Sequence, residues 1–133
     1  MSAVDNQSIK EQIAKDYLLY LEEGNMNKVV DLFAENGMVV SPLYGTQSAR
    51  EFYKILAGDT STSELKFDGL FYEKNSNRIS LLFDYIWGLK DGKKVQFKVV
   101  DIIELDTNNK IEKLSIIYDT IHSRTAVEQM KNE

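Results

Sequence analysis

The 133-residue chain has no cysteine, one proline and one histidine, and its apolar runs are short. The absence of cysteine excludes disulfides, thiolate chemistry and cysteine-based metal sites. A single histidine and no inward-facing acidic cluster argue against a metal site, and we expect no cofactor. No apolar run approaches the ~20 residues of a membrane span, so a membrane partner is not expected either.

The charge is modest and acidic, with a formal net value of −5 and sixteen lysines and arginines scattered along the chain. Nucleic acid is therefore not an expected partner, because a phosphate footprint needs a clustered basic face. The composition is that of a folded globular protein, and residues 1–133 fit one domain with one core. The stretch MSAVDNQSIKEQ lacks the apolar core of a secretory signal, so a cytoplasmic location is expected.

The N-terminal part has the periodicity of helices. A helix is predicted over residues 8–23 by apolar residues at steps of four, which are Ile9, Ile13, Tyr17 and Leu21. Ser8 and Glu11 form a capping-box pattern at its start. Two further helices are predicted over about 27–35 and 47–57.

The rest of the chain alternates with the period of strands. A brief strand through Val40 breaks at Pro42, and four longer strands are predicted near residues 64–73, 78–89, 93–106 and 110–121. The separators KNSN, KDGK and TNNK suit hairpins, which indicates an antiparallel meander. The predicted fold class is α+β, with the helices packed on one face of a curved antiparallel sheet. The first seven and the last ten or so residues are expected to be loosely held.

The inward faces of these strands are rich in large and aromatic residues. They are Ile79, Leu81, Phe83, Tyr85 and Trp87 on one strand, and Leu114, Ile116 and Tyr118 on the last. These side chains could fill a core or line a cavity, and periodicity leaves both open.

One carboxylate interrupts an inward face. In KVQFKVVDIIELD, every second residue from Val95 is apolar except Asp101. A buried carboxyl resists ionisation and can then donate a hydrogen bond. Tyr17 is a candidate partner, and two such donors in a dry pocket could hold a developing oxyanion. The structural alternatives are that Asp101 caps a helix, pairs with a basic residue or faces a wet end of the sheet.

Four stretches carry a family resemblance: YLLYLEEGNMNKVVDLFAENGMVVSPLYG, SAREFYKIL, VVDIIEL and NKIEKLSIIYD. Over roughly residues 9–120 the chain resembles the cone-shaped, cystatin-like NTF2-like superfamily, and most of all ketosteroid isomerase and SnoaL-like proteins. The resemblance implies helices packed on a curved sheet. It says less about activity, because one fold hosts many chemistries.

The resemblance also implies roles for individual residues. The oxyanion-hole tyrosine and aspartic acid of the isomerase fall on Tyr17 and Asp101, and a supporting tyrosine falls on Tyr53. Its general base, an aspartate before a proline, is replaced here by Ser41. A second network tyrosine appears as Phe33, and an indole position appears as Tyr118.

Serine cannot shuttle a proton as a carboxylate does, so the base is missing. The other titratable candidates are expected to face solvent or, for the histidine, to lie at the end of the last strand. They are Asp84, Glu104, Glu112, Asp119 and His122. Three sources of a base remain possible: the ligand itself, a water held by Ser41, or a residue elsewhere in the chain. With a base, the expected chemistry is acid–base catalysis of isomerase, lyase or cyclase type on an apolar carbonyl compound.

The first functional hypothesis is a pocket for a small apolar molecule of steroid-like or polyketide-like type, with Tyr17 and Asp101 donating to its oxygen. The expected pocket walls are Leu21, Phe33, Phe52, Leu81, Phe83, Tyr85, Phe97, Val99, Leu114, Ile116 and Tyr118. The alternative is a non-catalytic dimeric interaction module without a pocket. Either form is expected to be a homodimer, because the outer face keeps apolar residues, namely Val100, Ile102, Ile117 and Ile121.

Overall fold

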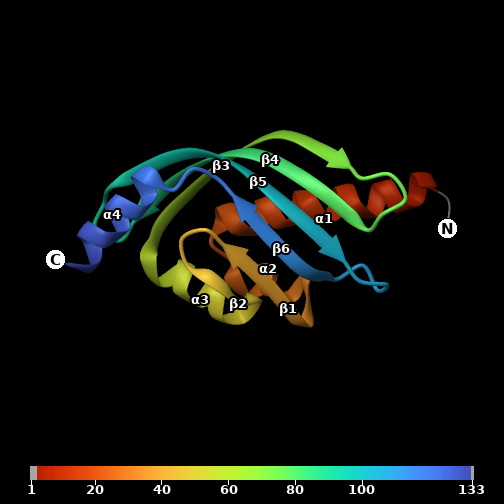
Figure 1. Ribbon diagram of the computed structural model, residues 1–133, viewed down its shortest axis with the longest axis horizontal. Helices are drawn as coiled ribbons and strands as arrows, with labels where there is room; N and C mark the ends of the chain where they lie inside the picture. The colour runs from red at the N-terminus through yellow and green to blue at the C-terminus, as the bar shows by residue number, and fades with distance from the viewer. Residues whose placement is uncertain (1–2, 133) are drawn as a thin grey trace.

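The computed structural model describes residues 3–132, which are built around a six-stranded sheet. Its strands are β1 (Phe33–Ser41), β2 (Gly45–Ser48), β3 (Thr60–Tyr72), β4 (Arg78–Leu89), β5 (Lys94–Leu105) and β6 (Ile111–Ile117). They lie in the order β2-β1-β6-β5-β4-β3. Strands β3 to β6 form the predicted antiparallel meander, and β1 joins it parallel to β6. The sheet curves without closing (Figure 1).

The helices of the described chain are α1 (Ala3–Glu23), α2 (Met26–Asp31), α3 (Ala49–Asp59) and α4 (Ile121–Lys131). Helix α1 runs across the concave side of the sheet and contacts β3 (Figure 1). Helix α2 packs between α1 and α3, and α3 contacts β1. This arrangement confirms the predicted α+β architecture, with N-terminal helices on one face of a curved sheet.

Two predicted helix boundaries are wrong. Helix α1 begins at Ala3, so the Ser8–Glu11 pattern lies inside the helix and does not cap it. Helix α2 ends at Asp31 because the chain pairs with β6 from there, and the carbonyl of Leu32 accepts a hydrogen bond from the amide of Ile111 at 3.0 Å.

The C-terminal residues require the largest correction. The predicted last strand extended to Ile121 and was followed by a loose tail, whereas β6 ends at Ile117 and α4 follows. The amide of Ile121 donates to Asp119 Oδ1 at 3.0 Å, which orders the start of this helix. Only Ser123 and Val127, one turn apart, are buried on α4, so its apolar periodicity is weak. Ile121 therefore lies on α4 and not on the outer face of the sheet.

The inward faces of β4 and β5 are buried as predicted. All five alternate residues of β4 from Ile79 to Trp87 are buried, and on β5 only Phe97 of the corresponding row is half-buried. Asp101 is 1% exposed and lies opposite Leu81 on β4 and Ile116 on β6. Period-two alternation therefore places its carboxyl group inside the curve of the sheet.

Candidate functional site

A cavity of about 50 Å³ lies between the sheet and the helices. Its lining includes eleven of the residues singled out from the sequence, which are Tyr17, Leu21, Ser41, Phe52, Phe83, Tyr85, Phe97, Val99, Asp101, Ile116 and Tyr118. Four others are buried in the core without lining the cavity, namely Phe33, Tyr53, Leu81 and Leu114. Three lining residues had not been predicted as pocket walls, and they are Tyr44, Leu56 and Trp87.

Asp101 is the most unusual residue of this lining. Among the described residues, its Oδ1 has no hydrogen-bond partner although the atom is buried. Burial raises the pKa of the Asp101 carboxyl well above its usual value, which favours the neutral acid. A neutral carboxyl group can donate one hydrogen bond as well as accept. None of the three structural alternatives holds in the described chain. Asp101 neither caps a helix nor pairs with a basic side chain, and with 1% exposure it does not face a wet end of the sheet.

Tyr17 finds a partner in Tyr53 rather than in Asp101. Their hydroxyl oxygens, from α1 and α3, are 2.7 Å apart, and either can be the donor. Burial raises the pKa of both hydroxyls, so both keep their protons. Two hydroxyls carry two protons and their mutual bond uses one. When Tyr53 is the donor, the proton of Tyr17 is available to the cavity that Tyr17 lines together with Asp101.

Ser41 ends β1 and stabilises the turn that follows. Its Oγ accepts hydrogen bonds from the amides of Leu43 and Tyr44 at 3.1 and 3.0 Å. The side chain is buried and lines the cavity. The hydroxyl therefore has a structural role here, and its own proton remains free to donate.

A polar network surrounds Tyr44 at one end of the cavity. Tyr44 donates to Asp59 Oδ2 at 2.6 Å, and Lys131 Nζ lies 2.5 Å from Asp59 Oδ1. The ring of Tyr44 meets the ring of Trp87 edge-on at 6.5 Å, and Trp87 Nε1 donates to Thr60 Oγ1 at 2.7 Å. Burial, followed by the hydrogen bond to Asp59, raises the pKa of Tyr44. Trp87 was visible in the sequence as an inward residue, whereas Tyr44 lies in a turn and belongs to no periodic pattern.

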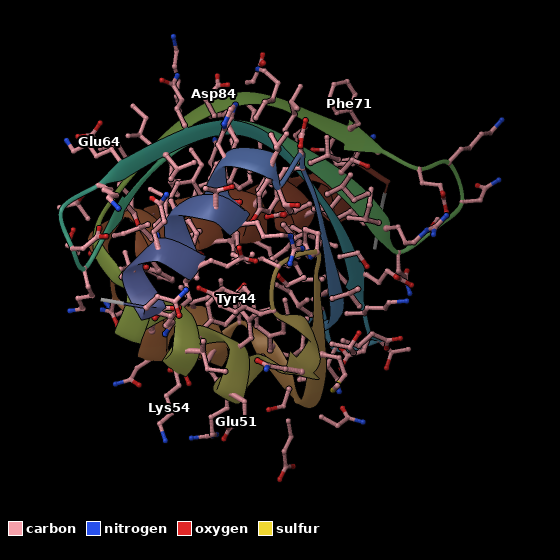
Figure 2. All side chains as sticks on the ribbon, turned by 60° about the vertical axis from the view of Figure 1, so that its left-hand side comes forward. Tyr44, Glu51, Lys54, Glu64, Phe71 and Asp84 are labelled. Atoms are coloured by element: carbon pink, nitrogen blue, oxygen red, sulfur yellow. The ribbon has the colours of Figure 1, made fainter. Side chains whose placement is uncertain are left out.

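Helix α4 lies across this end of the cone, close to Tyr44 (Figure 2). Arg124 Nη2 donates to the carbonyl of Pro42 at 2.6 Å, and Lys131 binds Asp59 on α3. Lys93 Nζ, at the turn between β4 and β5, donates to Gln129 Oε1 at 3.1 Å. These contacts connect α4 to three neighbouring segments and keep the end of the cone covered.

The other titratable residues considered as bases lie away from the cavity. Asp84 projects from the outer face of the sheet and is 3.2 Å from Lys98 (Figure 2). Asp119 lies just before α4 and accepts from the amide of Ile121, and His122 is exposed on that helix. Glu104 and Glu112 do not line the cavity either. The described part of the chain has no group of His, Asp and Glu side chains that could hold a metal ion, and no helix able to cross a membrane.

The sequence matches no family model and no curated protein sequence. Solved structures do match. An NTF2-like protein from Burkholderia pseudomallei is 16% identical, with a TM-score of 0.75, covering 86% of this chain and 94% of its own. The chain has an NTF2-like fold. SalBIII is an epoxide hydrolase/cyclase-like enzyme of pyran ring formation in the polyether salinomycin. It is 17% identical, with a TM-score of 0.74, covering 86% of this chain and 93% of its own. TerC, co-crystallised with polyporic acid, is 12% identical, with a TM-score of 0.75, covering 90% of this chain and 98% of its own.

An NTF2-like fold is a scaffold and does not specify a reaction. The arguments for function therefore come from the groups inside the cone. In this chain those groups are a buried carboxyl, a pair of tyrosines and an aromatic lining.

Proposed function

We propose that the protein binds a small apolar molecule carrying a carbonyl or phenolate oxygen, to which Asp101 and Tyr17 donate hydrogen bonds. The unpartnered Oδ1 of Asp101, in a carboxyl group that is 1% exposed, carries the proposal. A buried polar atom without a partner costs stability, and a ligand oxygen would supply that partner. The small molecules associated with TerC and SalBIII on the same fold support this reading.

The proposed ligand is larger than the space now present. A cavity of 50 Å³ suits a few water molecules, whereas ligand pockets commonly reach ~300 Å³ or more. The rings of Tyr85, Phe97 and Tyr118, which line the cavity, stack with centroids 5.4 and 4.3 Å apart. Binding therefore requires these rings to separate or α4 to move.

The proposed chemistry is electrophilic assistance without a built-in base. Neutral donors stabilise a developing enolate or oxyanion at a carbonyl oxygen. No carboxylate or imidazole of the described residues stands opposite them in the cavity, and Ser41 is committed to its turn. Isomerase-, lyase- or cyclase-type catalysis would then depend on a base carried by the ligand or on a bound water.

The first test is a fluorescence titration with 2-naphthol, a planar phenol that mimics an oxyanion. Wild type is expected to bind, and Tyr17→Phe and Asp101→Leu should each weaken binding by about tenfold or more, the worth of one good hydrogen bond. Tyr72→Phe is the matched control, because Tyr72 lies on β3 away from the cavity and is 39% exposed.

Failure of folded wild type to bind 2-naphthol would contradict the proposal. It would favour the alternative, a non-catalytic interaction module with a filled cone. Equal weakening by all three substitutions would point to a general loss of packing instead of two specific donors.

We further propose that the protein is a homodimer paired through the outer face of the sheet. Val100 on β5 and Ile117 on β6 are paired neighbours there, and Ile117 is 56% exposed. Phe71 projects from the same face at the edge strand and is also 56% exposed (Figure 2). Exposed apolar groups that line up across strands are typical of a protein interface.

Ile117→Lys is therefore expected to convert a dimer to a monomer, because it buries a charge at the proposed interface. Light scattering coupled to gel filtration measures the mass. Ile121→Lys is the control, since Ile121 is 62% exposed but lies on α4, off this face. A wild type of monomer mass, or equal effects of the two substitutions, would refute this arrangement.

A further inference from the structure

The hydroxyl group of Tyr44 donates its proton in a hydrogen bond to Asp59. Tyr44 lies in the turn between β1 and β2 and lines the cavity at the end covered by α4 (Figure 2). Its Oη is 2.6 Å from Asp59 Oδ2. A carboxylate only accepts hydrogen bonds, so Tyr44 must be the donor in this pair.

Asp59 is held in place from both sides. It is the last residue of α3, its side chain is 5% exposed, and its Oδ1 is 2.5 Å from Lys131 Nζ. The backbone carbonyl of Asp59 also accepts from the amide of Lys90 at 3.1 Å. The carboxylate of Asp59, held by the ammonium of Lys131, forms a charge-assisted hydrogen bond with the hydroxyl of Tyr44. The hydroxyl proton therefore stays in this bond. Tyr44 lines the cavity, and to a ligand that reaches its hydroxyl it can offer only the lone pairs of the oxygen.

At another level of the cavity the polar groups are hydrogen-bond donors instead of acceptors. Asp101 lies opposite Leu81 on β4, whereas the ring of Tyr44 meets Trp87 on the same strand. Leu81 and Trp87 are six residues apart on β4, so the two groups lie at different levels along this strand. Apolar and aromatic walls, among them Phe83, lie between the two levels. The hydroxyl of Tyr118, which also lines the cavity, is 3.3 Å from Ser123 Oγ on α4. Beside it Tyr44 adds an acceptor, whereas the donors Asp101 and Tyr17 lie at the other level.

We infer that Tyr44 determines specificity, by accepting a hydrogen bond from a hydroxyl or N–H group at the outer end of the ligand. The inference rests on the proposed function and narrows its ligand class. The expected ligands are elongated, flat and apolar molecules with a carbonyl oxygen at one end and a hydrogen-bond donor at the other. A site that accepts a hydrogen bond discriminates against analogues that lack the donor, because its own polar group is then left unpaired.

Three biphenyls that differ only at one end test the inference. They are 4-acetylbiphenyl, its 4′-hydroxy derivative and its 4′-methoxy derivative, each titrated by fluorescence. Wild type should bind the hydroxy compound about tenfold more tightly than the other two, the worth of one hydrogen bond. Tyr44→Phe should remove this preference, so that the three compounds bind the variant with similar affinities.

Asp59→Asn tests whether the hydroxyl of Tyr44 selects the ligand by hydrogen bonding or whether its ring only packs against the ligand. The amide of asparagine can donate to Tyr44, which frees the tyrosine proton to point into the cavity. The preference should then shift toward the methoxy compound, which only accepts. Arg124→Met is the control for loosening α4, because it removes the bond to the Pro42 carbonyl and leaves Tyr44 and Asp59 in place. It should keep the wild-type preference.

The outcomes distinguish this inference from the proposed function. If 4-acetylbiphenyl binds in an Asp101-dependent way but the hydroxy compound gains nothing, the role of Tyr44 is overturned and the proposed function stands. Equal loss of all three ligands in Tyr44→Phe means that the hydroxyl only supports the packing through its bond to Asp59, which also overturns the inference. If none of the three binds to folded wild type, both fail.

Discussion

Asp101→Asn is expected to make the protein more stable than wild type at neutral pH, and the gain should disappear near pH 4. Asparagine has nearly the shape of a neutral carboxyl group and does not titrate. Burial raises the pKa of Asp101 well above its usual value, so the folded wild type keeps a proton that the unfolded chain releases. The stability of wild type therefore depends on pH, and this contribution is absent from the variant.

The direction of the effect follows from proton binding. Below the pKa of ~4 of an unfolded aspartate, both states of wild type carry the proton and the difference between wild type and variant is independent of pH. As the pH rises, the unfolded state loses its proton while the folded state keeps it, so wild type loses stability until the pH passes the folded pKa. The loss amounts to about 1.4 kcal/mol per pH unit over this window.

Urea unfolding of wild type and Asp101→Asn at a series of pH values from 4 to 8 measures the difference. Asp101→Leu provides a second comparison, because it removes the same titration with a different shape. Both variants should show the same slope against wild type and different offsets. A difference that stays constant from pH 4 to 8 would show that Asp101 is ionised in the folded protein, and the donor role would then be lost.

Much of the site was predictable because a strand has a strict period. Alternation on β4 and β5 assigns each side chain to one face, and a single carboxyl in an apolar row is conspicuous. That reasoning found Asp101 and the aromatic walls. It also placed Asp84 outside, where it pairs with Lys98. Helical steps of four likewise placed Tyr17 on the inward side of α1, where it is 2% exposed.

The network around Tyr44 was not predictable, because tertiary packing alone brings its members together. Asp59 is 15 positions from Tyr44 and 72 from Lys131 in the sequence. Neither periodicity nor a local motif joins a turn, a helix end and the C-terminal helix. Helix α4 was missed for a related reason, since it buries little of its own surface and is held by polar contacts such as that of Arg124.

The volume of the cavity also could not be predicted from the sequence. The same inward aromatics can leave a large pocket or stack against one another, and the rotamers decide. Here Phe97 stacks on Tyr118 with the ring centroids 4.3 Å apart and leaves only a small space. The prediction that these residues face the interior needs only the strand period, whereas the volume between them depends on side-chain packing.

Ser41→Asp is expected to create proton-transfer activity on a β,γ-unsaturated ketone, seen as the absorbance of the conjugated product. The carboxylate would take a proton from the α-carbon and return it to the γ-carbon, while Asp101 and Tyr17 stabilise the enolate oxygen. A positioned general base contributes about 10²- to 10⁴-fold to such a step. The gain should be lost again when Asp101→Leu is added.

The turn at Ser41 is already suited to this change. The amides of Leu43 and Tyr44 point at the Oγ of Ser41 at 3.1 and 3.0 Å, and an aspartate accepts from the same amides in an Asx turn. Hydrogen bonds from backbone amides stabilise the ionised form, so the new carboxylate should be charged and its second oxygen free to act.

Ser41→Asn is the matched control, because asparagine accepts the same two amide bonds without supplying a base. Activity in Ser41→Asp but not in Ser41→Asn would show that the electrophilic half of the site is functional and that the base alone is missing. Equal inactivity of the two folded variants would mean that no ketone reaches the donors. In that case the unpartnered oxygen of Asp101 would be a cost of the fold and not a group that activates this ketone.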